Sequence, residues 1–413
     1  VGWIHNYLHG GTTSMVSAGE LHIPGLAFDA LTPELVLSIA ITSKHTTGRM
    51  RPSGVKVNAG TVLLVPGMTE EHFDRAHREG IDQLKFIFYD WNRLGDGEAQ
   101  RYVRWAHERG MTVKLHSGGV SRSGSSRVAG ADVVLAVEPD VVGHISGGPI
   151  PPPDSDIIAI IAGLPDTHVE VCSSNNYRAT TVVVDELRRV GRLDRLTLGT
   201  DTPGGTGVIP RGMLRNICYL ASVCGVDPVT AVAAATGQTA RAHGLDTGVI
   251  AEGRPADLLV LGPITGSAAT DALDSFALGD LPGIASVLVD GVPLVATRSE
   301  QTPPPSRSVT WRGADVRPAA VIVFVYAFIL YYFKQKSQIP MSTTWVFIGL
   351  LGGREIAAVK GLGKEAAIVA MLLRRNLFQP IEAQIPHLNH GRSRRPGGAD
   401  NRHIRCCRVG RPA

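Results

Sequence analysis

The chain has 413 residues, of which 44% are hydrophobic, and a formal net charge of +4. This length can bury a large core, and a barrel of about 250–300 residues with additional segments is a reasonable expectation. The charge is uneven: residues 301–413 hold 17 Lys and Arg against 5 Asp and Glu, whereas residues 1–300 hold 24 against 32. The acidic larger part excludes a nucleic-acid footprint, and the split indicates two segments of different role or origin.

Residues 1–300 alternate between strand-like and helix-like stretches. We predict strands at 12–18, 55–65, 82–89, 112–116, 140–144, 167–172 and 195–201, and helices at 32–46, 69–78, 98–109, 211–224 and 227–243. Strands and helices that alternate at this spacing favour a parallel sheet covered by helices. After position 201 the pattern changes to two helices and then a small β unit, at 247–261 and 285–295.

The tail after residue 300 has a different character. Three prolines mark residues 301–307 as a linker or domain end. The uncharged run 319–333 would extend ~22 Å as a helix, short of the ~30 Å hydrocarbon core of a bilayer. A second apolar stretch follows at 343–353. From Arg374 onward the chain is basic and punctuated by Pro and Gly, and residues 392–413 are typical of disorder.

The five cysteines are odd in number, and their spacing fits neither a zinc ribbon nor a disulfide framework; they are Cys172, Cys218, Cys224, Cys406 and Cys407. We therefore expect a reducing, cytoplasmic compartment for residues 1–300. The chain opens on Val1 without an initiator Met, as if in the middle of a domain, so we expect a truncated N-terminus.

Three apolar, β-branched runs each end on a residue that can bind a metal ion and then turn on glycine. These residues are His116, His144 and Asp201. Because the C-terminal ends of parallel strands converge on one mouth, where barrel enzymes carry their chemistry, we expect the three to meet. Two neutral imidazoles and a carboxylate are a partial ligand set for a zinc-type ion. Lys85, at the end of the preceding strand, would be a fourth ligand.

The separations along the chain agree with this arrangement. His116 and His144 are one strand–helix unit apart, and Asp201 follows about two units later. This spacing puts them on the fifth, sixth and eighth strands of a barrel whose first strand is absent. Substrate-binding groups would come from the strand-end loops, with Ser117, Arg122 and Ser146 as candidates.

These segments resemble the amidohydrolase superfamily of metal-dependent barrel hydrolases, and among them the enamidase-like members. The resemblance covers about residues 1–297 and rests on His9–Met15 (HGGTTSM), Ser17–Gly25 (SAGELHIPG), Lys114–Gly119 (KLHSGG), Gly143–Pro149 (GHISGGP), Gly199–Pro203 (GTDTP), Ala234–Leu245 (AATGQTARAHGL) and Gly248–Leu261 (GVIAEGRPADLLVL). The last two are the most specific to the superfamily.

The resemblance implies a distorted (β/α)8 barrel with a small β-sandwich, and a centre of one or two metal ions, usually zinc, with Fe2+ as the alternative. His116 and His144 would be ligands, and Asp201 would bind metal and carry the proton from water to the leaving nitrogen. Lys85 matches the position that is carboxylated and bridges two metals in many members.

Two features depart from the superfamily. Its first strand carries a His-x-His pair, and this chain has none upstream of His116. The tail segment Ile339–Glu355 instead resembles part of a bacterial phosphate-permease-like membrane protein, so we expect a gene fusion or a chimeric sequence. A catalytically impaired fragment, or a membrane-associated fusion protein, is therefore an alternative to an active hydrolase.

We accordingly predict an α/β, TIM-like (β/α)8 barrel that lacks its first strand, with a β-sandwich remnant and a partly helical, partly disordered tail. The predicted segments are an incomplete barrel (1–246), the sandwich remnant (247–300), a linker (301–318), apolar helical segments (319–375) and a basic disordered tail (376–413). Any membrane contact is expected only through 319–353.

The expected reaction is hydrolysis of a non-peptide C–N bond in a cyclic amide or enamide, a small-molecule substrate. Asp201 would act as general base and then as general acid, and His144 would help to stabilise the tetrahedral oxyanion. A deaminase or dipeptidase chemistry on the same metal site is the second enzymatic alternative. We expect a homo-oligomer.

Overall fold

The computed structural model describes residues 2–19, 30–87, 97–119, 128–147, 150–173, 176–203 and 207–307. The chain divides into two compact units, Val1–Arg312 and Gly313–Ala413, and all the described residues belong to the first. The boundary falls within the predicted linker 301–318, whereas the finer division of the chain stays a prediction. The predicted helical segments, the permease-like stretch and the basic tail lie outside the described residues.

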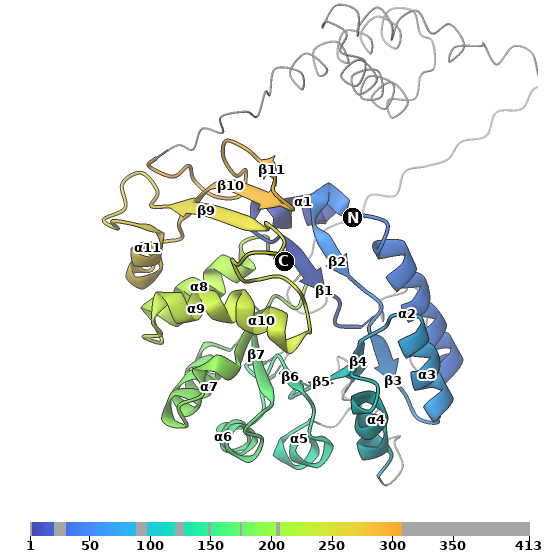
Figure 1. Ribbon diagram of the computed structural model, residues 1–413. Helices are drawn as coiled ribbons and strands as arrows, with labels where there is room; N and C mark the ends of the chain where they lie inside the picture. Colours follow the sequence, from blue (N-terminus) through green and yellow to red (C-terminus); the bar gives the residue numbers. More distant parts are fainter. Residues whose placement is uncertain are drawn as a thin grey trace, which may run out of the picture. The chain divides into compact units, whose positions relative to one another are not determined.

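A six-stranded parallel sheet forms the centre of the first unit (Figure 1). Its strands are neighbours in the order in which they occur in the chain: β3 (Val62–Leu64), β4 (Gln83–Phe86), β5 (Thr112–His116), β6 (Val141–Gly143), β7 (His168–Cys172) and β8 (Leu196–Gly199). Their β-branched and leucine side chains are buried, as in parallel sheets that are covered on both faces. The predicted α/β class is therefore confirmed.

Helices connect the strands of this sheet and lie along its outer side (Figure 1). They are α3 (Glu70–Arg78), α4 (Glu98–His107), α5 (Ala131–Val137), α6 (Asp154–Gly163) and α7 (Tyr177–Arg189), the last of which leads through a short 3-10 turn, η4 (Leu193–Arg195), into β8. Each helix turns an apolar stripe to the sheet; in α4, for example, Tyr102 and Ala106 are fully buried.

The predicted strand 55–65 is interrupted in the structure. Its first part, β2 (Lys56–Asn58), pairs in parallel with β1 (Ser14–Val16) in a separate two-stranded sheet, and its second part is β3. The break falls at Gly60, which has φ of +103°, and a Cβ there would lie only 2.7 Å from the Cβ of Lys44. Close approach to helix α2 (Pro33–Thr47) thus requires glycine here and ends the strand.

The predicted helix 227–243 is likewise two helices, α9 (Pro228–Ala235) and α10 (Gly237–Ala242), which follow α8 (Gly212–Ser222). Asp227 caps α9 as expected, because its side chain accepts from the Thr230 N–H at 3.1 Å. The break is at Thr236, whose φ and ψ of −123° and −96° are not helical. The new helix direction ties α10 to the sheet, since Thr239 Oγ1 accepts from the Leu198 N–H at 3.1 Å.

A three-stranded antiparallel sheet confirms the predicted small β unit. It consists of β9 (Leu258–Gly262), β10 (Gly283–Val289) and β11 (Val292–Val295), with α11 (Ala272–Leu278) between β9 and β10. The N-terminal helix α1 (Gly2–His9) lies near β10 and near the 3-10 turn η2 (Pro52–Gly54) (Figure 1). No ranges were predicted for α1, α5, α6, α7 or α11. None of the described helices is both long and apolar enough to cross a bilayer.

Candidate active site

The predicted ligands lie at or just beyond the C-terminal ends of their strands. His116 is the last residue of β5, His144 directly follows β6, and Asp201 comes two residues after β8. The sheet register pairs His116 with Gly143, which brings His144 beside it. Lys85 lies within β4, and its register partner on β5 is Lys114. The pairing of neighbouring strands therefore brings the two histidines together, although a whole helix separates them in the chain.

The two imidazoles are in direct contact. Nδ1 of His116 and Nε2 of His144 are 2.8 Å apart, and the rings meet edge to face with centroids at 4.1 Å. Burial, followed by the charges of neighbouring residues, lowers the pKa of His144 to about 3 and that of His116 well below its ordinary value. Both rings are therefore neutral near pH 7, which is the form in which histidine binds metal ions.

This pair suits a metal ion. Two facing nitrogens of neutral rings need either a shared proton or a cation that accepts both lone pairs. Nδ1 of His144 is buried and has no hydrogen-bond partner among the described residues. No hydrogen bond at Nδ1 therefore determines which of the two ring nitrogens of His144 carries the proton. The chemistry of the two rings thus fits a zinc-type centre.

The place of Asp201 relative to the two histidines is less direct. The described residues contain no group in which ligand atoms of His116, His144 and Asp201 all lie within 4.8 Å of one another. Asp201 is nevertheless near enough to Lys85 for its charge to raise the pKa of that amine. The structure therefore joins the two histidines directly, and the role of Asp201 as a further ligand stays a prediction.

Lys85 belongs to a buried group of charges that the sequence analysis did not identify. Burial, then the charge of Lys114, lowers the pKa of Lys85 to about 8, while Asp201 and Glu170 oppose this shift. Lys114 donates to Glu170 Oε2 at 2.5 Å, and both side chains are almost completely buried. A lowered pKa makes the unprotonated amine, which is the form that can act as a ligand, easier to reach than in an ordinary lysine.

Glu170, on β7, positions the backbone of His144. Its Oε1 accepts from the His144 N–H at 3.2 Å, while its other oxygen binds Lys114. Burial alone would raise the pKa of Glu170, but Lys114 lowers it far below the ordinary range, so the carboxylate stays charged. His144 has φ of +35°, which non-glycine residues adopt only when their surroundings hold them there. The signal in the sequence was a charged residue in the middle of a buried strand.

The segment that carries Asp201 is fastened to α1. The hydroxyl of Tyr7 is hydrogen-bonded to Thr202 and accepts from the Ile209 N–H at 3.0 Å. Tyr7 is 1% exposed, and Asp201 itself has φ of +53°. The first helix therefore helps to determine where the Asp201 carboxylate lies.

The predicted substrate-binding serines make local backbone contacts. The Ser117 hydroxyl donates to the carbonyl of Gly143 at 2.8 Å, and Ser146 Oγ accepts from the Cys172 N–H at 3.4 Å. Both serines are fully buried, which indicates that they brace the strand ends. Arg122 lies outside the described residues. The substrate-binding role of the three stays a prediction.

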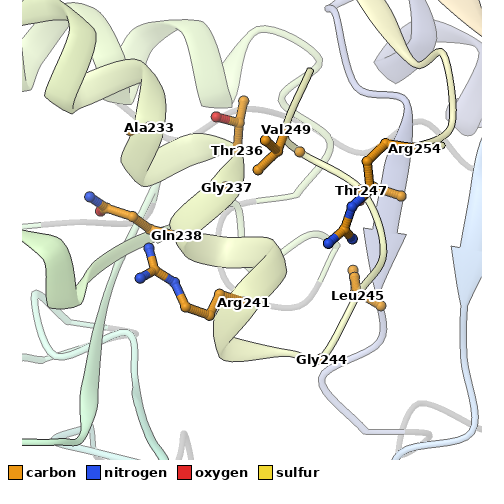
Figure 2. Close-up of a pocket in the computed structure, with 11 residues that line it drawn as sticks. Ala233, Thr236, Gly237, Gln238, Arg241, Gly244, Leu245, Thr247, Val249 and Arg254 are labelled. Carbon is orange, nitrogen blue, oxygen red and sulfur yellow. The ribbon is translucent and has the colours of Figure 1, made fainter. Parts of the chain in front are cut away.

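A pocket of about 630 Å³ lies elsewhere, between α9, α10 and the segment from Gly244 to Arg254 (Figure 2). Two guanidinium groups, of Arg241 and Arg254, line it together with Gln238, and none of the predicted site residues takes part. Arg254 is also ion-paired with Asp246. This pocket is thus separate from the histidine pair.

Comparison with known proteins identifies the family of this chain. A family model described as "Amidohydrolase family" matches residues 97–294, the region that contains both histidines and Asp201. The enamidase of Eubacterium barkeri is 40% identical over 306 residues, which are 74% of this chain and 78% of that protein. The crystal structure of an enamidase, described as a new member of the amidohydrolase superfamily, matches with a TM-score of 0.69 and 39% identity over 74% of this chain and 78% of its own.

A D-hydantoinase structure matches at 16% identity with a TM-score of 0.49, over 75% of this chain and 82% of its own. The relative at 40% identity, matched over most of its own length, is close enough to decide the family. The strand-end histidines therefore belong to a hydrolase that acts on C–N bonds other than peptide bonds, and the chain is a member of the amidohydrolase family.

Proposed function

We propose that this chain hydrolyses the amide C–N bond of a small cyclic amide or enamide, at a metal centre held by His116 and His144, with Lys85 and Asp201 as further ligands. The observation that carries the proposal is the 2.8 Å contact between His116 Nδ1 and His144 Nε2 at the C-terminal edge of the sheet, in a chain 40% identical to an enamidase. Opening of the ring by water would give a carboxylate and a free enamine nitrogen.

The metal, of which zinc is the type, would supply Lewis acidity that makes water nucleophilic near neutral pH and polarises the substrate carbonyl. The Asp201 carboxylate would take the proton of the attacking water and return it to the leaving nitrogen, which must be protonated before the C–N bond breaks. His144, held by Glu170 through its backbone, keeps its ring at the reacting edge. Tyr7 holds the segment that carries Asp201.

The test uses the full chain supplied with zinc and a six-membered cyclic enamide, with release of the carboxylate followed by proton NMR. We expect turnover of the enamide and a fall in kcat of about 10²- to 10⁴-fold in Asp201→Asn, because the proton carrier is lost while the shape of the residue is kept. His77→Asn, an exposed change on α3, is the control and should retain the parental rate.

Two results would refute the proposal. One is the absence of turnover for cyclic enamides and saturated lactams alike in a folded, zinc-supplied protein. The other is an Asp201→Asn variant that is as fast as the His77→Asn control, since Asp201 could then carry no proton in the reaction.

A further inference from the structure

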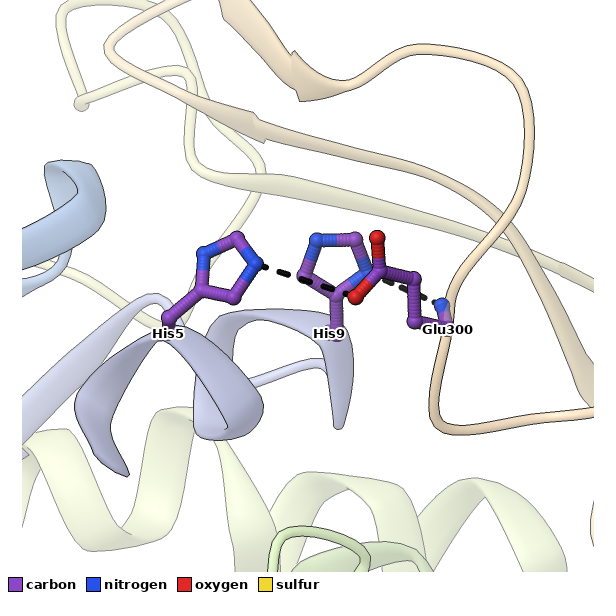
Figure 3. Close-up of side chains that lie close together, drawn as sticks. All are labelled: His5, His9 and Glu300. Carbon is purple, nitrogen blue, oxygen red and sulfur yellow. Dashed lines mark hydrogen bonds and ion pairs between the residues drawn. The ribbon is translucent and has the colours of Figure 1, made fainter. Parts of the chain in front are cut away.

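A second group of metal-binding side chains lies on α1 and on the segment that follows β11, not on the strands that carry His116 and His144. His5 and His9 are one helical turn apart, with ring centroids at 4.5 Å, and Glu300 lies beside them (Figure 3). One nitrogen of each ring and one carboxylate oxygen all lie within 4.8 Å of one another. Figure 3 shows the side chains of all three residues gathered at one place.

The backbone that carries Glu300 is held in place by three hydrogen bonds. The Glu300 N–H donates to His9 Nδ1 at 2.9 Å, and the Ser299 hydroxyl donates to the carbonyl of His9. Gln301 donates to Asn6 Oδ1 at 3.4 Å. Three consecutive residues are thus fastened to the last turn of α1, and a ligand that uses Glu300 need not order this segment first.

The electrostatic surroundings favour a cation at this position. His9 is the last residue of α1, where the partial negative charge of the helix C-terminus attracts positive charge. The Glu300 carboxylate lies 3.9 Å from His5 Nε2. Burial, followed by the neighbouring His5, lowers the pKa of His9, so its ring is neutral near pH 7. His5 and Glu300 are exposed, which leaves room for water as an additional ligand.

We propose that His5, His9 and Glu300 bind one divalent transition-metal ion of the zinc type, and that this ion cross-links α1 and residues 299–301. Two imidazoles and a carboxylate suit zinc and its neighbours rather than Mg2+ or Ca2+, which require oxygen ligands. Nδ1 of His9 already accepts a hydrogen bond from the Glu300 N–H. An ion that binds this nitrogen must displace that bond. The site is therefore weaker than a closed structural zinc site.

The bound ion would also affect the segment that carries Asp201. Tyr7 lies between His5 and His9 in the same helix and is hydrogen-bonded to Thr202. An ion that fixes α1 against residues 299–301 would therefore restrain the anchor of the Asp201 segment. Nothing in this binding site uses His116 or His144, so it does not depend on the proposed function.

The experiment is a zinc titration by calorimetry on the full chain after removal of metal with a chelator. We expect that His5→Gln and Glu300→Gln each lose one equivalent of bound zinc, or bind it with a Kd weaker by at least about tenfold. Glu300→Gln keeps the backbone N–H bond to His9, so it removes the ligand without loosening the segment. The rise in Tm on adding zinc should shrink in both variants. Mg2+ should give no heat at this site.

His45→Gln is the matched control, because His45 forms an exposed pair with Glu79 at 2.8 Å that is part of no group of three potential ligands among the described residues. It should bind zinc as the parent does. The proposal is overturned if His5→Gln and Glu300→Gln, with parental circular dichroism, bind as many equivalents as His45→Gln at the same affinity. Loss of enamide hydrolysis plays no part in this readout, so failure of the proposed function would leave the result unaffected.

Discussion

Glu170 occupies the middle of β7, where an uncompensated carboxylate would be strongly disfavoured. Lys114 neutralises it at 2.5 Å, and its second oxygen accepts from the backbone of His144. The same charge that offsets burial thus also fixes a residue with φ of +35° at the reacting edge. The pair explains how the charged side chains of Lys114 and Glu170 can both be buried within this sheet.

Breaking this pair on one side should be costly. In Glu170→Gln the buried Lys114 ammonium loses its counter-charge, so we expect the free energy of unfolding to fall by about 3 kcal/mol in urea denaturation. The double variant Glu170→Leu with Lys114→Met should recover part of this loss, because neither member of the pair is then left as an unpaired buried charge. Glu79→Gln, at an exposed pair, should change stability by less than about 1 kcal/mol. Equal stabilities for Glu170→Gln and Glu79→Gln would contradict the assigned role.

His243 gives a pH dependence that can be isolated. Burial, followed by Lys114, lowers its pKa from 6.5 to about 4, and its Nδ1 lies 3.0 Å from Gln83 Oε1. Between these pH values the unfolded chain binds more protons at this residue than the folded one, so stability falls as the pH drops through the window. The contribution is at most about 1.4 kcal/mol per pH unit.

The measurement is urea denaturation at a series of pH values. Between pH 6.5 and pH 4, the free energy of unfolding should fall less steeply with decreasing pH in His243→Gln than in the parent, and the difference in slope should correspond to at most one proton. Above pH 6.5 the two profiles should run parallel, because the residue is then neutral in both states. Parallel profiles below pH 6.5 as well would mean that His243 is not kept neutral by the fold.

At the level of residues, the sequence predicted that His116 and His144 would lie together, but it did not predict the buried ion pair of Lys114 and Glu170 beside them. His116 and His144 stand out because each ends an apolar run before glycines, and the parallel register then makes them neighbours. Lys114 and Glu170 lie inside such runs, and only the strand order shows that β5 and β7 bring them together across β6. A sequence pattern carries no information about which interior charges face each other.

Among the elements, α6, β7 and β8 are joined by one buried side chain. Arg195, the last residue of η4 and directly before β8, is 1% exposed and donates to three carbonyls, those of Thr167 at 2.8 Å, Ile161 at 3.0 Å and Leu164 at 2.5 Å. Two of these carbonyls belong to the C-terminal end of α6, where the helix itself supplies no donors. The guanidinium therefore closes the helix and fixes it against the sheet.

Arg195→Met should lower the free energy of unfolding by about 3 kcal/mol, because it removes the guanidinium donor from three carbonyls, of which that of Leu164 keeps a long bond from the Thr167 N–H at 3.4 Å. The measurement is urea denaturation followed by circular dichroism. Arg178→Met is the control: Arg178 pairs with Asp154 in solvent, and its loss should cost less than about 1 kcal/mol. A comparable small effect in both variants would show that the carbonyls find other partners.

The elements themselves were largely predictable, and the differences have local causes. Periodicity cannot reveal that the stretch 55–65 serves two sheets, because the reason is contact between Gly60 and Lys44. Nor can it reveal the break at Thr236, which is set by the docking of α10 on β8. The strand spacing implied helices between the strands, but no ranges were predicted for α5, α6 and α7. Helices α1 and α11, only eight and seven residues long, were missed. Such short helices depend on tertiary packing more than on their own sequence.

In the whole molecule, consecutive parallel strands bring residues from β4 to β8 to the same edge of the sheet. Helix α1 is connected to the segment after β8 through Tyr7, and to residues 299–301 through His9. The relative that is matched over most of its length shows the family of this chain. It does not show which residues bind the metal. Strand position predicted that Asp201 would join the histidines, but its placement depends on the turn after β8 and on Tyr7, which no strand pattern encodes.

The most direct test of the metal centre is anomalous scattering at the zinc edge from crystals of the full chain grown with zinc. We expect a peak about 2.0–2.1 Å from both His116 Nδ1 and His144 Nε2. The peak should be absent in His144→Asn, a change that the left-handed backbone at this position tolerates. If enzymatically active crystals instead show the two imidazoles hydrogen-bonded to each other with no peak between them, the proposed centre is contradicted.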